Sequence, residues 1–347
     1  MSSLIAYEVH AEGEPGRVIV DGMPELPAGT MLQKMRWLEA NRDDIRLRML
    51  REPNGYPALC ANAIVPSDHP DADAGFIIME QAEYPPMSGS NTICVATALL
   101  ESGLIPIVEP VTELTLEAPA GLIRIRAECR DGKVTKVRFR NVASFALALD
   151  VPVEVPTIGI VSVDIAWGGM FYAVADGDAL GIDLSAANGM EIARTGELIR
   201  QATLEQHPVV HPDDPSITGP TISQLHGAPT VAGAHRRNAV TVSTGPVDWD
   251  RPETWRGALD RCPCGTGTSA AMALRYARGE LAVGDRFVHE GPLGTTFDCR
   301  VLDETTIGGQ PAIVPEIGGQ GWITGRTEYL LDPTDPFPEG YRVGDIW

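Results

Sequence analysis

The sequence predicts a mixed α/β (α+β) protein of two pseudo-symmetric halves, each with a β-sheet wrapped around a central buried helix. Many short apolar runs are separated by 36 glycines and 28 prolines, which is typical of short strands joined by turns. Two Ala-rich segments have almost no polar face, as expected of buried helices. Each segment follows a copy of one short motif, and the copies begin at Ser88 and Cys264.

Period-two alternation and short apolar runs place the expected strands. In the first half they are Leu4–Val9, Arg17–Val20, Phe76–Met79, Leu114–Leu116, Leu122–Ala127 and Val134–Phe139. In the second half they are Ile158–Ile165, Met170–Val174, Ala239–Ser243, Arg286–Val288, Phe297–Val301, Ala312–Val314 and Gly321–Ile323. Two other helices are expected, at Met31–Asn41 behind the N-cap candidate Thr30 and at Glu197–Gln206.

The two buried helices are expected at Ile93–Ser102 and Ser269–Arg278, and each stops at a glycine. The motifs before them are Ser88-Gly89-Ser90-Asn91-Thr92 and Cys264-Gly265-Thr266-Gly267-Thr268. A glycine and hydroxyl groups ahead of a helix are typical of an anion-binding helix N-terminus. We therefore expect the side chains of Ser88 and Cys264 to flank one small carboxylate, as a two-sided proton-transfer site.

The two halves are expected to be residues 1–155 and 156–323. The boundary rests on Val151–Thr157, where Val-Pro-Val-Glu-Val-Pro-Thr reads as an extended linker, since a residue before proline avoids helical backbone. The C-terminal segment 324–347 is expected to return to the first half and complete it.

Composition limits the possible functions. The chain has 347 residues, and its 44% hydrophobic and 21% charged content is that of a globular protein. A formal net charge of −20 argues against a nucleic-acid surface. No stretch has the roughly 20 apolar residues of a membrane span, and the N-terminus lacks signal-peptide features, so a cytoplasmic protein is expected. The six cysteines are expected to be reduced.

Cys264 is the strongest candidate for a reacting group. A helix N-terminus favours the thiolate form, which is a good base for a carbon acid in a dry site. A lone cysteine is more often an inert core residue, but the glycines beside Cys264 permit close backbone approach to a ligand. The hydroxyl of Ser88 is too weak an acid to rest ionised. It would act as a proton relay or as a hydroxyl polarised by the helix end.

Other chemistries fit the motifs less well. The pair Cys262-Pro263-Cys264 lacks the two-residue gap of zinc and thioredoxin motifs, and no second Cys or His pair complements it, so no metal is expected. A thiol hydrolase would need a general base close to Cys264, and the motif supplies none.

The segment Asp260-Arg261-Cys262-Pro263-Cys264-Gly265-Thr266-Gly267-Thr268 closely resembles the second active-site motif of the proline racemase family. Ser88-Gly89-Ser90 is similar to its first motif, usually Met-Cys-Gly-His. Supporting matches span nearly the whole chain, at residues 10–15, 167–172 and 294–297. The resemblance implies a diaminopimelate-epimerase-like fold, no cofactor, a homodimer and a cyclic imino acid as substrate.

The resemblance also implies roles for individual residues. Backbone N–H groups of Gly89, Ser90, Gly265 and Thr266 would bind the substrate carboxylate. Asp260 would contact the ring nitrogen, and Ser88 would face the α-hydrogen of the L-substrate.

Two departures from the family motifs guide the choice of reaction. Ser88 replaces the usual Cys and Ser90 replaces the usual His, which is typical of the branch similar to trans-3-hydroxy-L-proline dehydratases. In that substrate the hydroxyl and the α-hydrogen share one ring face, so one group can serve the loss of water. The expected activity is cofactor-independent dehydration to Δ1-pyrroline-2-carboxylate. The alternative is a 4-hydroxyproline 2-epimerase or proline racemase. A non-catalytic imino-acid binding protein is a further alternative.

Overall fold

The computed structural model describes residues 3–347, which form two compact units. Unit 1 comprises the chain up to Phe139 together with Gly318–Trp347, and unit 2 comprises Arg140–Ile317. Each unit is a mixed α+β structure, as predicted.

The elements of unit 1 are two helices and a set of strands. The helices are α1 (Met31–Leu50) and α2 (Gly89–Glu101). The strands are β1 (Ser3–Ala11), β2 (Glu14–Asp21), β3 (Cys60–Val65), β4 (Ala74–Met79), β5 (Val111–Ala118), β6 (Gly121–Arg130), β7 (Lys133–Arg140) and β19 (Gly321–Leu330).

Unit 2 also contains two α-helices, α3 (Gly189–Gln206) and α4 (Gly265–Ala277). Its strands are β8 (Phe145–Val155), β9 (Gly159–Trp167), β10 (Phe171–Asp176), β11 (Val209–His211), β12 (Asp214–Gly219), β13 (Ile222–Gly227), β14 (Arg236–Ser243), β15 (Gly257–Leu259), β16 (Arg286–Glu290), β17 (Thr296–Ile307) and β18 (Gln310–Gly319).

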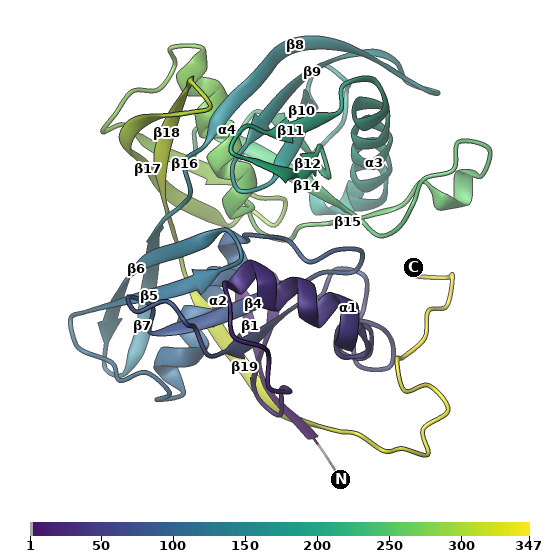
Figure 1. The fold of residues 1–347 in the computed structure, drawn as a ribbon. Helices are drawn as coiled ribbons and strands as arrows, with labels where there is room; N and C mark the ends of the chain where they lie inside the picture. Colours follow the sequence, from purple (N-terminus) through teal and green to yellow (C-terminus); the bar gives the residue numbers. More distant parts are fainter. Residues whose placement is uncertain (1–2) are drawn as a thin grey trace. The chain divides into compact units, whose positions relative to one another are not determined.

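The two units repeat one pattern of strand pairing. Figure 1 labels the four α-helices and many of the strands. In unit 1, β1–β2, β3–β4 and β5–β6 are antiparallel pairs, whereas β2–β3 and β4–β5 are parallel. In unit 2, β9–β10, β13–β14 and β16–β17 are antiparallel, whereas β10–β13 and β14–β16 are parallel. Parallel pairs need crossover connections. Helices α1 and α3 lie in the first crossover of each unit, and α2 and α4 lie in the second.

In unit 2, alternate residues of strand β10 pack against different helices. On β10, Tyr172 and Val174 join the core cluster of α4, whereas Ala173 and Ala175 join the cluster of α3. Successive residues of a strand point to opposite faces, so this alternation places α3 and α4 on opposite faces of the strand. In unit 2 the predicted central helix is α4, and the helix expected at Glu197–Gln206 is part of α3, which covers the other face of β10.

Helices α2 and α4 are buried, as predicted. Every residue of Gly89–Leu100 and of Gly265–Leu274 is buried. Both helices have 13 residues and end on a right-handed C-cap. A glycine with positive φ follows each, Gly103 at 79° and Gly279 at 72°, which is the conformation that favours glycine after a helix.

The linker expected at Val151–Thr157 is wrong. Most of this segment belongs to β8, which forms a hairpin with β9 and places Pro152 opposite Ser162. Val153 and Val155 are buried, so the apolar alternation outweighs the prolines as a signal. Unit 2 therefore begins at Arg140 rather than at residue 156. The C-terminal return to unit 1 starts at Gly318 rather than at residue 324, and β19 pairs antiparallel with β1.

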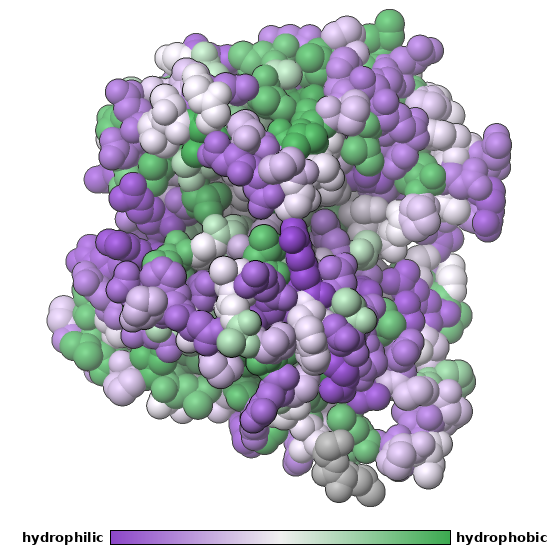
Figure 2. Space-filling view, in the orientation of Figure 1, coloured by the Kyte–Doolittle hydropathy of each residue, from purple (hydrophilic) through white to green (hydrophobic). Residues whose placement is uncertain are grey.

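Hydrophilic residues cover much of the face in Figure 2, with apolar residues scattered among them. This surface agrees with the net charge of −20, which favours solubility. Of the helices in residues 3–347, none combines the length and hydropathy needed to cross a lipid bilayer.

Gly168 should be intolerant of substitution because it follows β9 directly against α4. A Cβ there would lie 2.1 Å from the carbonyl oxygen of Thr266 and 2.6 Å from the backbone nitrogen of Ala270. Gly168→Ala should therefore lower the free energy of unfolding by about 1–3 kcal/mol, measured by urea titration. Gly245→Ala is the matched control, because a Cβ there meets nothing within 4 Å. Equal stability of the two variants would contradict this packing.

Candidate functional site

Cys264 is the N-cap of α4 and has an unusual backbone. Its φ is 60° and its ψ is 116°, a region that side chains rarely adopt and that costs on the order of 1–3 kcal/mol. Hydrogen bonds hold the residue there, because its N–H donates to Cys262 Sγ at 3.2 Å and its carbonyl accepts from the Thr268 N–H at 2.8 Å. Such strain is typical of functional positions.

The thiol of Cys264 lies among hydrogen-bond donors. The Gly267 N–H donates to Sγ at 3.4 Å, and Tyr172 Oη lies 3.2 Å from it. Tyr172 Oη is also 2.7 Å from Thr266 Oγ1, which is itself 3.7 Å from Sγ. Burial raises the pKa of Tyr172 well above its usual value, so the phenol keeps its proton and can donate to the thiol.

Two effects raise the pKa of Cys264. Burial is the larger, and the negative charge of Asp260 adds to it, while hydrogen bonds from Tyr172, Gly267 and Thr266 act in the opposite direction. The thiol is therefore the resting form, and the expected thiolate is wrong for the substrate-free protein. Burial also raises the pKa of Asp260 to about 6, although its hydrogen bond with Cys264 opposes the shift. Asp260 is thus largely ionised at neutral pH.

The loop before α4 is fixed by buried polar side chains. Asn238 Nδ2 donates to the Pro263 carbonyl at 2.7 Å, and Thr268 Oγ1 donates to the same oxygen at 3.1 Å. Asn141 Nδ2 donates to the Gly168 carbonyl and to Ser269 Oγ, at 2.9 and 2.8 Å. These contacts set the position of Cys264 within unit 2.

Ser88 is the N-cap of α2 in unit 1 and has ordinary extended backbone, with φ −146°. Its Oγ accepts a hydrogen bond from Asn91 Nδ2 at 2.9 Å and lies 3.5 Å from Ser90 Oγ. Asn91 Oδ1 in turn accepts from Asn62 Nδ2 at 2.6 Å. Because Asn91 donates to Ser88 Oγ, the serine proton is free to be given to another group, and an alkoxide at Oγ would be stabilised.

The first turns of α2 and α4 carry backbone donors. The leading N–H groups of an α-helix have no acceptor within the helix. They belong to Gly89 and Ser90 in α2 and to Gly265 and Thr266 in α4. The helix dipole favours an anion at such positions. Each helix start can therefore bind a carboxylate without Lys or Arg.

The structure groups the predicted residues by unit. Unit 1 brings together Ser88, Gly89 and Ser90, and unit 2 brings together Cys264, Asp260, Gly265 and Thr266. Sequence reasoning missed Asn91 and Tyr172. Asn91 stands inside the first motif, and Tyr172 closes the Trp167–Tyr172 match, so a signal was present for both.

Within residues 3–347, no group of three or more His, Cys, Asp or Glu side chains is placed to hold a metal ion. Cys262 does not pair with Cys264 in a disulfide, and both cysteines are buried. The Cys262 sulfur instead accepts the hydrogen bond from the backbone of Cys264.

Comparisons with known proteins agree on one family. The family model described as proline racemase matches residues 6–342. 4-Hydroxyproline 2-epimerase 1 from Rhizobium rhizogenes strain K84 is 39% identical over 342 residues, which are 98% of this chain and 95% of that protein.

Two crystal structures are similar over almost the whole chain. One is a probable proline racemase from Agrobacterium radiobacter K84 with bound carbonate, with 38% identity, a TM-score of 0.91 and coverage of 99% and 98% of the two chains. The other is a hydroxyproline epimerase from Agrobacterium vitis with bound trans-4-hydroxy-L-proline, with 35% identity, a TM-score of 0.91 and coverage of 100% and 97%. A PhzF-family protein from Bacillus anthracis shares the fold alone, at 12% identity and a TM-score of 0.59.

Two substitutions should move the pKa of Cys264 in opposite directions. Tyr172→Phe removes a donor to the thiol and should raise the pKa of Cys264. Asp260→Asn removes a negative charge and should lower it. The measurement is the pH dependence of iodoacetamide alkylation at Cys264, followed by peptide mass spectrometry.

Tyr276→Phe is the matched control, because its hydroxyl donates to the Glu304 side chain at the surface. It should leave the alkylation profile unchanged. A shift of the same sign in Tyr172→Phe and Asp260→Asn would refute the assigned electrostatics.

Proposed function

Because the chain belongs to the proline racemase family, we propose that it is a cofactor-independent isomerase that inverts the α-carbon of 4-hydroxyproline, with Ser88 and Cys264 as its proton-transfer pair. The observation that carries the proposal is similarity over 98% of the chain to a 4-hydroxyproline 2-epimerase. The hydroxyproline epimerase structure with bound trans-4-hydroxy-L-proline adds support. This choice reverses the order expected from the sequence, where dehydration stood first.

The proposed substrate is a zwitterion, and both of its charges need partners. Its carboxylate would accept hydrogen bonds from the N–H groups of Gly89, Ser90, Gly265 and Thr266. Its ring ammonium would pair with Asp260, which is largely ionised at neutral pH. The ammonium would offset the charge that raises the pKa of Cys264. Substrate binding would therefore make the thiolate easier to form at the point where a base is needed.

Inversion needs one group to take the α-proton and another to supply a proton on the opposite face. The electron pair left by the proton moves into the substrate carboxylate, where the helix N–H groups stabilise the added charge. Cys264 would serve one face and Ser88 the other. Asn91 supports the serine, because its amide donates to Ser88 Oγ in whichever protonation state that oxygen has.

Dehydration of trans-3-hydroxy-L-proline is the second candidate, and Ser88 itself favours it. A serine is a weaker acid than the cysteine usual in the first motif, so a Ser–Cys pair is less well matched for inversion than two thiols. Loss of water needs chemistry on one ring face only. The catalytic pair thus favours dehydration, whereas the similar proteins favour epimerisation.

One substrate panel separates the two activities. In D₂O, trans-4-hydroxy-L-proline should yield cis-4-hydroxy-D-proline with deuterium at the α-carbon, detected by chiral chromatography and mass spectrometry. Trans-3-hydroxy-L-proline is incubated in parallel, and any pyrroline is trapped with o-aminobenzaldehyde. Ser88→Ala and Cys264→Ala serve as controls and should not invert 4-hydroxyproline. Pyrroline formation without inversion would replace the proposal with the dehydratase, and inertness toward both substrates would reject both candidates.

The pH profile tests the role of Asp260. Its carboxylate must be ionised to pair with the ammonium, and its pKa is raised to about 6. We expect kcat/KM to fall as the pH drops below about 6, since protonation removes the partner charge. Asp260→Asn should abolish this acid limb along with most of the activity. An acid limb near pH 4, as for an ordinary carboxyl, would contradict the assignment.

A further inference from the structure

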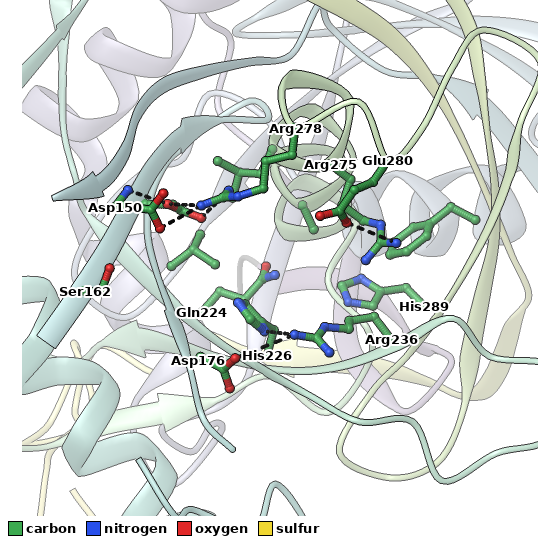
Figure 3. Close-up of a pocket in the computed structure, with 15 residues that line it drawn as sticks. Asp150, Ser162, Asp176, Gln224, His226, Arg236, Arg275, Arg278, Glu280 and His289 are labelled. Atoms are coloured by element: carbon green, nitrogen blue, oxygen red, sulfur yellow. Dashed lines mark hydrogen bonds and ion pairs between the residues drawn. The ribbon is translucent and has the colours of Figure 1, made fainter. Parts of the chain in front are cut away.

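Unit 2 contains a cavity (Figure 3) whose lining does not include Cys264. Its volume is about 270 Å³. Helix α4 forms one wall through Ala271 and Leu274, which lie after the turn that carries Cys264. Strands β10, β13, β14 and β16 supply other walls. The cavity thus lies along the helix whose first turn forms the candidate site, but Cys264 and Asp260 do not line it.

The inner end of the cavity carries buried polar atoms without partners. Gln224 and His289 are both fully buried. Within the part of the chain that the structure describes, neither amide atom of Gln224 has a hydrogen-bond partner, nor does His289 Nε2. Each such group costs about 1–3 kcal/mol. In Figure 3 both side chains extend toward the cavity, so a polar group of a ligand could satisfy them.

Part of the cavity lining is apolar. Val174, Leu274 and Phe287 line it, and Phe287 is almost fully buried. A dry apolar cavity of roughly 150 Å³ accepts benzene. This cavity is larger, so it has room for one ring with a polar group at each end.

At the outer end, the arginines differ in how many of their N–H donors remain available to a ligand. Arg278 is occupied, because it donates to both carboxylate oxygens of Asp164. Arg236 contacts His226 Nδ1 at 2.8 Å and the partly exposed Asp176 at only 3.8 Å. Donors of Arg236 therefore stay available to an anion.

Arg275 also has N–H donors available to a ligand. It pairs with the exposed Glu280 at 3.3 Å, and its buried Nε has no partner among the described residues. The carboxylates of Asp150, Asp164, Asp176 and Glu280 line the same cavity. These four carboxylates outnumber the three arginines of the lining, so a dianionic phosphate is disfavoured, and a single carboxylate would have to take the place of the long contacts that Arg236 and Arg275 make with Asp176 and Glu280.

We propose that this cavity is an effector site for a small ring-bearing carboxylate with a second polar group across the ring. The carboxylate would pair with Arg236 and Arg275. The ring would lie between Leu274 and Phe287, and the second polar group would bond Gln224 and His289.

Gln224 and His289 also contact residues that hold Cys264 in place. A Cβ added to Gly267 would lie 2.6 Å from Gln224 Oε1, so the amide packs against the residue whose N–H donates to the thiol. His289 Nδ1 lies 2.9 Å from Thr268 Oγ1, which holds the Pro263 carbonyl. A ligand that binds Gln224 and His289 therefore acts on the first turn of α4, and its occupancy should change the reactivity of Cys264.

The test uses 4-hydroxybenzoate as the probe, titrated calorimetrically into the full chain. Benzoate lacks the second polar group and 4-hydroxybenzyl alcohol lacks the carboxylate, so each should bind at least about tenfold more weakly. Arg236→Gln and, independently, Arg275→Gln should weaken 4-hydroxybenzoate about tenfold or more. Arg286→Gln is the control, because its exposed side chain pairs with Asp298 and does not line the cavity.

Ser88→Ala distinguishes this site from the candidate active site and should leave 4-hydroxybenzoate binding unchanged. Saturating 4-hydroxybenzoate should also change the rate of Cys264 alkylation by iodoacetamide, and Arg236→Gln should remove that change. Neither readout needs catalytic turnover, so the result is independent of the proposed function. Absence of saturable binding, or binding lost in Ser88→Ala and kept in both arginine variants, would overturn the site. Binding without a change in alkylation would overturn its effector role.

Discussion

The constraint on which the rest depends is that α2 and α4 begin inside the protein. A helix start exposes N–H groups without intrahelical acceptors, and burying them is costly unless something accepts their hydrogen bonds. Both first turns are buried, and neither contains an acidic residue. An anionic ligand is the natural acceptor. An acidic protein with a net charge of −20 can thereby bind a carboxylate without basic side chains.

Electrostatics then set the state of the reacting groups. Burial and, to a lesser extent, the charge of Asp260 raise the pKa of the Cys264 thiol in the free protein, while Tyr172 and Gly267 supply donors that stabilise a thiolate. The arrangement therefore favours ionisation only when a cation reaches Asp260. Ser88 is supported differently, by an amide chain through Asn91 and Asn62. The two helix starts share a topology, but their chemistry is not equivalent.

Much of the fold could be predicted because local sequence patterns mark many of its helices and strands. The capping box at Thr30, where the Thr30 hydroxyl accepts from the Gln33 N–H and the Gln33 side chain accepts from the Thr30 N–H, marks the start of α1. The continuous apolar character of 93–100 marks a buried helix. The end of α1 was missed because a kink at Arg42, with φ −143°, interrupts the helical pattern, yet the helix resumes to Leu50. Strand β13 was missed because its buried Ser223 and Gln224 break the apolar pattern.

The candidate site could likewise be predicted only in part from the sequence. Cys264, Asp260 and Ser88 could be selected from motifs, because their neighbours in sequence are also their neighbours in space. Tyr172 could be assigned to Cys264 only from the structure, because 92 residues separate them and the packing of α4 against β10 brings them together. The protonation state of Cys264 was mispredicted because the helix end is visible in the sequence, whereas the depth of burial is not.

The most direct test of the central claim is α-deuterium exchange from D₂O, measured separately for the two C2 epimers of 4-hydroxyproline. If Ser88 and Cys264 serve opposite faces, Ser88→Ala should exchange only the D-epimer and Cys264→Ala only the L-epimer, and neither should invert its substrate. If either variant exchanges both epimers at similar rates, or still inverts one into the other, the account of the two helix starts as a proton-transfer pair is contradicted.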